Sequence, residues 1–351
     1  MCHAIDNRIK QKYRYILGQF CLGEVLGSPF EFQEELVPPQ YEIWLEKIEN
    51  SAEPEWREPL TDKASQKVVG KTGDDVYFTL ALAHSLIEKE DFDPVYTDSK
   101  FQEAVKDNNM WGLGGSSYHW YQNRLHGFSI EQSAAPIGMA GGAPVMRYSP
   151  VPLRHPKNIA WIINTSIAQS KVTHQDDRCA FFAAAASLTL SYLLAGKEIS
   201  LSAITAYLIE RLMPCFPNLL YFLEDFTKNG TDWDKQYHWL SHLGIEDSTK
   251  HFKYLEERLK HNPHVHPFFG GYVPVTFLWP LCLVLKHEGK FLPAVHECIL
   301  MKGDTDTTAA VLGSLCGAWK MPEERIMKWV GRIDKSKEIL AVADTLASFQ
   351  K

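Results

Sequence analysis

The chain has 351 residues, of which 45% are hydrophobic and 23% are charged, as in ordinary globular proteins. This composition excludes disordered, fibrous and low-complexity proteins. The formal net charge of −7 provides no basic field for nucleic acid or for an anionic membrane, so we expect neither as a partner.

The cysteines and the first residues of the chain predict a cytoplasmic protein. The seven cysteines are odd in number, scattered and without a CxxC pair, which is typical of a reducing compartment. The sequence MCHAIDNRIKQKYRY is polar and lacks the apolar stretch of a secretory signal. The most apolar run, 179–195, is barely long enough to span a bilayer and is rich in small residues. We expect it to form a buried core helix.

Helical periodicity dominates the chain, and alternating strand patterns are nearly absent. Apolar residues spaced three and four apart predict helices at 76–87, 204–213, 277–285 and 308–319. Small residues at 183–186 and along 309–317 would let helix backbones approach closely.

Proline and glycine cluster in three segments, which we expect to be loops. These segments are 31–39, 136–156 and 261–274, and none is long or polar enough to be a flexible interdomain linker. We therefore predict an all-α fold, a compact multi-helix bundle in which residues 1–351 form a single domain.

The first candidate for chemistry is an acid that follows a predicted helix. Gly23 and Gly27 lie four apart on a helix that is expected to end at Pro29, so Glu31 projects from the loop that follows. Taken by itself, Glu31 is typical of a solvated acid in an acidic run.

Two acidic helix starts lie far apart in the sequence. Asp74 and Asp75 precede the helical run that begins at Val76, and Asp304, Asp306 and Thr307 precede a second apolar helix. Such residues can cap free backbone N–H groups, but one cap needs only one of them. Carboxylate and hydroxyl oxygens are also the ligands of hard divalent cations, and close carboxylates repel unless a cation compensates. We expect the two starts to share a site for Mg²⁺, with Mn²⁺ as an alternative.

Three other motifs each allow a functional or a purely structural interpretation. The glycine-rich segment from Gly138 to Arg147 fits either a cradle for a phosphate or diphosphate or a plain turn. His261, His264 and His266 could form a zinc site, since an HxH pair can ligate one ion. No acid or cysteine partner stands at a diagnostic spacing, so a partly exposed loop is expected. Cys179 and Cys282 lie in apolar helical stretches and are expected to be inert packing residues.

Taken in order, six segments resemble the ADP-ribosylglycohydrolase family, over a span of about Leu17 to Trp319. The resemblance implies a compact all-α domain that uses two Mg²⁺ ions to hydrolyse the bond joining ADP-ribose to a side chain or small acceptor. The most specific element is the GDTDT run, which is followed by two alanines, a glycine and a Gly-Ala pair. The segments are LGEVLGSPFEF, GDDVYFTLALA, GGAPVMRYSPVPL, THQD, GGYV and KGDTDTTAAVLGSLCGAW.

The resemblance also implies roles for individual residues. Glu31 matches the catalytic glutamate, and Glu31 or a metal-bound aspartate, Asp304 or Asp306, would act as general base. The dinuclear metal site would be formed by Asp74, Asp75, Asp304, Asp306 and Thr307. The ADP-ribose cleft would be lined by Gly138, Gly141, Gly142, Met146, Arg147, His174, Gly271 and Tyr272, with Tyr272 stacking on adenine.

Five positions depart from the family pattern. A hydroxyl residue that contributes to one metal is usual where Gly73 stands. Asp is usual at Glu24, Thr or Ser at Val76, and Asn at Gly142. Lys302 replaces a glycine and would either add a cation beside the metals or bind an anionic substrate.

Two functions therefore remain open. The first is a monomeric ADP-ribosyl hydrolase that acts on ADP-ribosylated proteins or a related conjugate, through an arginine, serine, ribose–ribose or small-molecule linkage. The second is a catalytically impaired relative that binds ADP-ribose or ADP-ribosylated partners. Retention of Glu31 and all four aspartates favours the hydrolase, because a chain freed from catalysis has little need for mutually repelling carboxylates.

Overall fold

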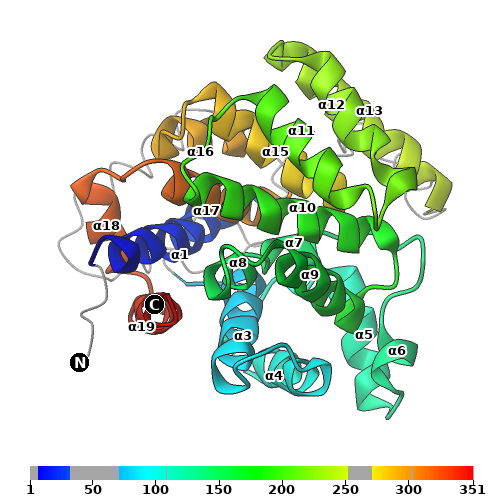
Figure 1. Ribbon diagram of the computed structural model, residues 1–351. Coiled ribbons are helices and arrows are strands. Elements are labelled where there is room, and N and C mark those ends of the chain that lie inside the picture. The colour runs from blue at the N-terminus through cyan, green and yellow to red at the C-terminus, as the bar shows by residue number, and fades with distance from the viewer. Residues whose placement is uncertain (1–6, 32–70, 108, 252–270, 302, 351) are drawn as a thin grey trace.

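Helices form the regular secondary structure in the part of the chain that the computed structural model describes, residues 7–31, 71–107, 109–251, 271–301 and 303–350 (Figure 1). Among these residues the only β pairing consists of two isolated bridges, Ala135 with His174 and Gly141 with Tyr272. The all-α prediction is confirmed.

The longer helices are α1 (Asn7–Gly27), α3 (Asp74–Glu88), α4 (Pro94–Lys106), α5 (Gly115–Leu125), α9 (Ile159–Thr173), α10 (Asp177–Leu194), α11 (Leu201–Leu212), α12 (Tyr221–Asn229), α13 (Trp233–His251), α15 (Val273–Lys286), α16 (Phe291–Leu300), α17 (Thr305–Trp319) and α19 (Ser336–Ser348). The shorter elements are η1 (Ser28–Phe30), α6 (Ile130–Ser133), α7 (Ala143–Met146), α8 (Pro150–Arg154), η2 (Pro217–Leu219) and α18 (Glu324–Val330).

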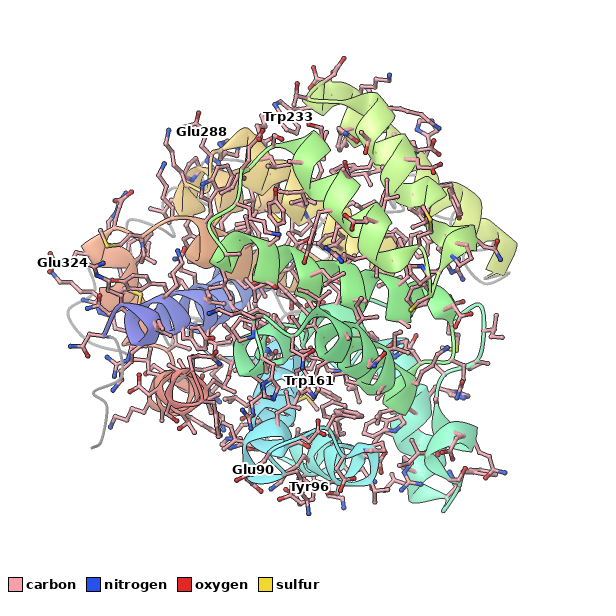
Figure 2. All side chains as sticks on the ribbon, viewed as in Figure 1. Glu90, Tyr96, Trp161, Trp233, Glu288 and Glu324 are labelled. Carbon is pink, nitrogen blue, oxygen red and sulfur yellow. The ribbon has the colours of Figure 1, made fainter. Side chains whose placement is uncertain are left out.

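Helix α10 runs through the middle of the bundle, as the apolar run 179–195 predicts. In Figure 1, α15 and α16 lie on one side of α10, and α3 and α4 lie on the other. Every α10 residue from Arg178 to Leu193 is buried, which agrees with a core helix. Side chains fill the spaces between the ribbons, whereas the labelled acids Glu288 and Glu324 lie at the edge of the molecule (Figure 2). None of the helices in the described ranges is long and apolar enough to cross a membrane.

Helices α1 and α17 lie side by side with their backbones in contact (Figure 1). Four glycines make this approach possible. A Cβ atom added at Gly23 would lie 2.1 Å from the Ala309 carbonyl oxygen, and one added at Gly313 would lie 2.0 Å from that of Gln19. Gly27 and Gly317 meet the opposite backbone in the same way. The close approach expected from the small residues at 309–317 is therefore made with the first helix of the chain.

The segment 136–156 is not the plain loop that its prolines predict. It contains the short helices α7 and α8, and Pro144 and Pro150 lie in their first turns. Proline is tolerated there, because the first N–H groups of a helix have no partner within it. The loop predictions at 31–39 and 261–274 fall almost entirely outside the described residues, although Pro274 lies in the first turn of α15.

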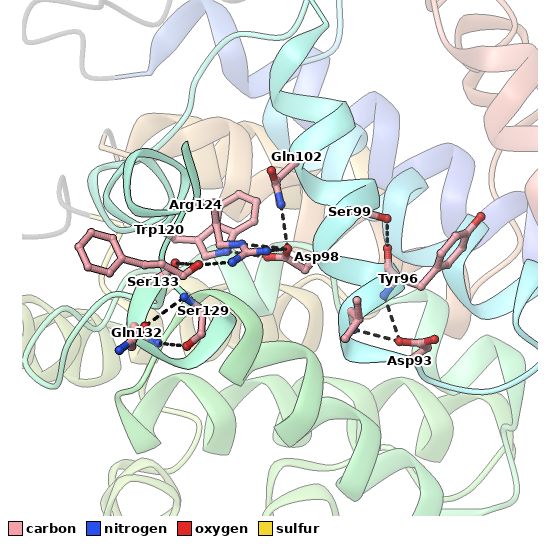
Figure 3. A network of polar contacts seen from close by, with 12 residues as sticks. Asp93, Tyr96, Asp98, Ser99, Gln102, Trp120, Arg124, Ser129, Gln132 and Ser133 are labelled. Carbon is pink, nitrogen blue, oxygen red and sulfur yellow. Dashed lines mark hydrogen bonds and ion pairs between the residues drawn. The ribbon is translucent and has the colours of Figure 1, made fainter. Parts of the chain in front are cut away.

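A buried aspartate on α4 holds the neighbouring helix α5 in place (Figure 3). Asp98 is 2% exposed. It accepts hydrogen bonds from the Trp120 indole (3.1 Å), the Gln102 amide (2.8 Å) and the Arg124 guanidinium Nε (3.0 Å). The first turn of α5 contains Ser116, which faces the glycine segment described below. This network therefore helps to position one wall of the candidate site.

Replacing Asp98 with Asn should lower the free energy of unfolding by about 2 kcal/mol, because the charge-assisted bonds to Arg124 are lost. Urea denaturation followed by circular dichroism measures the change. Asp93→Asn on the same helix is the matched control, because Asp93 caps the N-terminus of α4 and Asn caps equally well. Equal stability of the two variants would show that the Asp98 network contributes little.

Candidate metal centre

Carboxylates from three distant segments gather in two groups. Within each group, one oxygen of every carboxylate lies within 4.8 Å of the others. The members of the first group are all buried, and we call this group the buried cluster. The second group is partly exposed, and we call it the Glu31 cluster. The buried cluster consists of Glu24, Asp74 and Asp75, and the Glu31 cluster consists of Glu31, Asp304 and Asp306.

Local structure explains why these acids face one another. Helix α1 ends at Gly27, η1 turns the chain, and Glu31 follows with its N–H bonded to the Ser28 carbonyl (3.3 Å). The Thr305 hydroxyl donates to the Gly27 carbonyl (2.8 Å), so the start of α17 is fixed against the end of α1. The glycine contacts between the two helices thus bring the Glu31 cluster together.

Thr307 joins the two clusters. Its hydroxyl donates to Asp75 Oδ2 (3.3 Å), although the two residues lie 232 positions apart in the sequence. Asp304 occupies the N-cap position of α17 but makes no side-chain capping bond. Capping therefore does not explain the carboxylate of Asp304.

Burial and mutual repulsion both disfavour negative charge on the carboxylates of the buried cluster. Burial raises the pKa of Glu24 well above its usual range, and the charges of Asp306 and Asp74 raise it further. Burial likewise raises the pKa of Asp75, together with the charges of Glu24 and Asp74. Glu24 Oε2 and Asp75 Oδ1 are buried and have no hydrogen-bond partner among the described residues.

These oxygens fit a bound divalent cation. Every donor in the two clusters is a carboxylate oxygen, and Thr307 contributes a hydroxyl oxygen beside them. Hard oxygen donors are those that Mg²⁺ and Mn²⁺ prefer. A cation would satisfy the two buried oxygens and compensate the repulsion between the acids.

Without metal, the buried cluster should make stability fall as pH rises. A carboxyl whose pKa is raised by folding binds its proton more tightly in the native state than in the unfolded state. The free energy of unfolding then decreases as pH rises above the usual Asp pKa of about 3.9. In EDTA at pH 7.5, Asp75→Asn should therefore exceed the parent protein in stability, by about 1–4 kcal/mol.

This advantage should shrink as pH is lowered toward 4, because the parent carboxyl becomes protonated. Urea titrations at a series of pH values measure it. Asp177→Asn, at an exposed carboxylate on α10, serves as the control. A lower stability of Asp75→Asn at every pH would contradict the electrostatic argument.

The glycine segment predicted to bind a ligand lies directly beside the Glu31 cluster. A Cβ on Gly271 would lie 2.5 Å from Asp304 Oδ2, and Gly271 has a left-handed φ of 58°. A Cβ on Gly142 would lie 3.2 Å from the Gly271 carbonyl oxygen. Gly141 pairs with Tyr272 in a β-bridge, and its Cβ position lies 3.3 Å from His174 Nε2. The structure thus brings most of the predicted ligand residues to one place.

An ion pair ties this segment to Tyr272. Asp176 accepts from the Gly138 N–H (2.9 Å) and from Arg178 Nε (2.8 Å) and Nη2 (2.7 Å). Burial opposes the charge on Asp176, but the Arg178 and Gly138 hydrogen bonds prevail and lower its pKa to about 2. Arg178 Nη1 also donates to the Tyr272 hydroxyl (3.1 Å), and Tyr272 is 7% exposed. The pair therefore positions both Gly138 and Tyr272.

Arg147 faces the interior of the protein. Its side chain is fully buried and donates to Gln169 Oε1 (2.7 Å) and Thr173 Oγ1 (2.6 Å). Thr173 Oγ1 lies 2.8 Å from His174 Nδ1. Burial, reinforced by the Arg147 charge, lowers the pKa of His174 to about 3, so the imidazole is neutral. Because Arg147 donates to the Thr173 oxygen, the network favours a Thr173 hydroxyl that donates to Nδ1 and a proton on Nε2.

The buried Nε2 of His174 has no partner among the residues described, and it lies toward Gly141. Arg147 is thus linked to His174 through the Thr173 hydroxyl. Met146 is also buried, with 3% of its surface exposed. Neither side chain lies at the surface of the segment.

Comparison with known proteins identifies the family of this chain. The family model described as ADP-ribosylglycohydrolase matches residues 6–351. The chain belongs to the ADP-ribosylglycohydrolase family. A solved structure of an ADP-ribosylglycohydrolase-related protein complex is similar over 97% of this chain and 100% of that chain, with a TM-score of 0.61 and 18% identity. At this identity the likeness shows a shared fold. No curated protein matches the sequence.

Within this ADP-ribosylglycohydrolase fold, several residues at the site were not predicted from the sequence. Glu24 was noted only as a departure, yet it belongs to the buried cluster. Glu24 precedes Gly27 by three residues, and residues at this spacing lie on the same face of a helix. The sequence could therefore have predicted that Glu24 lies near the α1–α17 contact. No sequence pattern predicts that Ser116 and Arg178 lie at the site, because only the fold brings them there. Lys302, His261, His264 and His266 lie outside the described residues.

Proposed function

We propose that this protein is a Mg²⁺-dependent hydrolase that removes ADP-ribose from modified proteins or from a related ADP-ribose conjugate. The bond cleaved is the glycosidic bond at the distal ribose, and Mn²⁺ is an alternative ion. The observation that carries the proposal is the contact between the two acidic clusters through Thr307 and Asp75, with the Glu31 carboxylate at its partly exposed end. A monomeric, cytoplasmic, single-domain enzyme remains our expectation.

Five residues would hold the metal ions: Asp74, Asp75, Asp304, Asp306 and Thr307. Bound there, the ions would supply Lewis-acid chemistry by polarising ribose hydroxyls and lowering the pKa of water. The residues present fit this role, since their oxygens converge from α3 and α17 and two buried carboxylate oxygens in the centre lack partners among the described residues.

The carboxylates of the Glu31 cluster would carry the proton transfers. Cleavage at the anomeric carbon passes through an oxocarbenium-like state. A water oxygen bonds to the anomeric carbon as the bond to the leaving atom breaks. The water proton passes to a carboxylate, and a proton from this cluster or from solvent passes to the leaving atom. We assign this base to Glu31, which is partly exposed and lies within reach of Asp304 and Asp306. The two aspartates would orient the reacting groups.

The glycine segment would bind the ADP-ribose moiety. Gly138, Gly141, Gly142 and Gly271 allow close approach of backbone to ligand, and His174 would offer its Nε2 proton. Tyr272 is proposed to contact adenine while Arg178 holds its hydroxyl. Arg147 and Met146 would support this wall from the interior, where the structure places them.

Release of free ADP-ribose tests the proposal. Arginine-linked and serine-linked ADP-ribosylated proteins are incubated with the enzyme in Mg²⁺ and in EDTA, beside an Asp304→Ala/Asp306→Ala variant. We expect Mg²⁺-dependent release from at least one substrate and none from the double variant. The reactive substrate identifies the linkage.

A binding protein without catalysis is the second candidate, and the absence of a side chain at Gly73 favours it. No release from either substrate, with ADP-ribose still bound in a calorimeter, would support this candidate or indicate a different conjugate.

A further inference from the structure

We propose that Glu24 is a metal ligand in this protein, an oxygen donor that α1 contributes to the ion held by Asp74 and Asp75. The inference rests on the proposed function, because it deepens the description of the same metal centre. Glu24 is not among the metal ligands that the sequence pattern predicts.

Glu24 is placed as a ligand would be. Its side chain is completely buried, and one of its carboxylate oxygens lies within 4.8 Å of oxygens of both Asp74 and Asp75. The three acids come from two helices that meet only through the fold, so their proximity is not imposed by neighbouring sequence positions. Three buried carboxylates at this spacing repel one another unless a cation lies between them.

The two oxygens of Glu24 have different surroundings. Oε1 accepts from the backbone N–H groups of Gly73 (2.9 Å) and Val76 (3.3 Å). Both N–H groups lie at the start of α3. The N-cap residue, Gly73, has no side chain with which to cap them. Oε2 is buried and has no hydrogen-bond partner among the described residues. Oε1 is therefore occupied by capping, and Oε2 is the oxygen available to a cation.

Gly73 makes room for this arrangement. A Cβ at position 73 would lie 3.1 Å from Glu24 Oε1 and 3.0 Å from Trp111 Cζ2. A side chain there would press against the carboxylate or the indole ring. Glu24 thus reaches α3 from another helix and supplies the oxygen that a capping side chain at position 73 would otherwise provide.

Capping alone does not account for a carboxylate at this position. One neutral oxygen is enough to accept both N–H groups, so a glutamine would cap without adding charge to the cluster. A fully buried carboxylate beside two others is costly, and its unpartnered oxygen adds to that cost. Coordination of a cation by Oε2 offsets both costs.

Calorimetric titration with Mg²⁺ and with Mn²⁺ tests the assignment on the full chain, with bound Mn²⁺ also counted by electron paramagnetic resonance. Glu24→Gln should weaken binding of one ion by more than about tenfold and leave the other ion unaffected. In EDTA the same variant should unfold at a higher temperature than the parent, because a repelling charge is removed. Glu297→Gln, at a partly buried carboxylate on α16 that pairs with Lys286 and His287, is the control. It should leave metal binding unchanged, and it should not raise the unfolding temperature, because it loses these ion pairs.

A second pair of substitutions tests the coupling between Glu24 and Gly73. Glu24→Asp shortens the ligand and should weaken binding, and Gly73→Ser alone should be crowded by Glu24 and Trp111. Combined, the shorter acid leaves space for a hydroxyl that caps α3 and donates an oxygen. The double variant should therefore bind metal more tightly than Glu24→Asp alone. A double variant no tighter than Glu24→Asp would contradict the coupling.

The outcomes separate this inference from the proposed function. If the parent protein binds two ions and Glu24→Gln binds both with unchanged affinity, Glu24 is a cap only and the assignment is wrong. If the parent binds no ion, the metal centre of the proposed function fails, and the assignment of Glu24 fails with it.

Discussion

Replacing Glu31 with Gln is expected to slow release of ADP-ribose by about 10²- to 10⁴-fold, the usual contribution of a general acid or base. Gln keeps the size and hydrogen bonding of the side chain but cannot accept a proton from water. Affinity for ADP-ribose should change little, because Glu31 lies at the partly exposed end of the centre and the ligand contacts are proposed to come from the glycine segment. Initial rates under saturating substrate, together with calorimetry of ADP-ribose binding, measure the two effects separately.

Glu288→Gln is the control for this experiment, because Glu288 is exposed in the turn that follows α15. It should leave rate and affinity unchanged. Full hydrolysis by Glu31→Gln with normal binding of ADP-ribose would remove Glu31 from the role of base and leave Asp304 or Asp306 to perform it.

The positions of the helices could be predicted from sequence because their apolar residues recur with helical period. The run 277–285 became α15 (Val273–Lys286), and 308–319 became α17 (Thr305–Trp319). The boundaries shifted outward because first turns are polar or contain proline and so carry little apolar signal. For the same reason α7 and α8 were missed, since Pro144 and Pro150 were interpreted as breaks although they occupy first turns.

The candidate site was only partly predictable, and the reason is the range of its contacts. Asp74, Asp75, Asp304 and Asp306 could be selected because acids at helix starts form a local pattern. Glu24 could not be selected in this way, because its relation to α3 is created by packing between helices. The orientation of Arg147 is also tertiary, since its partners Gln169 and Thr173 lie on α9.

Gly23→Ala is expected to destabilise the protein by about 3 kcal/mol or more, at the upper end of the cost of overpacking. Alanine normally stabilises a helix interior by roughly 0.5–1 kcal/mol relative to glycine, so the expected sign is reversed. The reason is the backbone contact with α17, where the new Cβ would lie 2.1 Å from the Ala309 carbonyl oxygen. Only a shift of one helix against the other relieves this contact, and that shift separates Glu31 from Asp306.

Metal affinity and hydrolysis should therefore fall together with stability in Gly23→Ala, as measured by urea denaturation, calorimetry and release of ADP-ribose. Gly18→Ala is the matched control on the same helix, because its Cβ would meet only side-chain atoms, the nearest being Val330 Cγ1 at 3.1 Å. A side chain can move where a backbone cannot, so Gly18→Ala should cost far less. Equal stability of the two variants would mean that α1 and α17 do not cross in backbone contact, and the placement of Glu31 beside α17 would lose its physical basis.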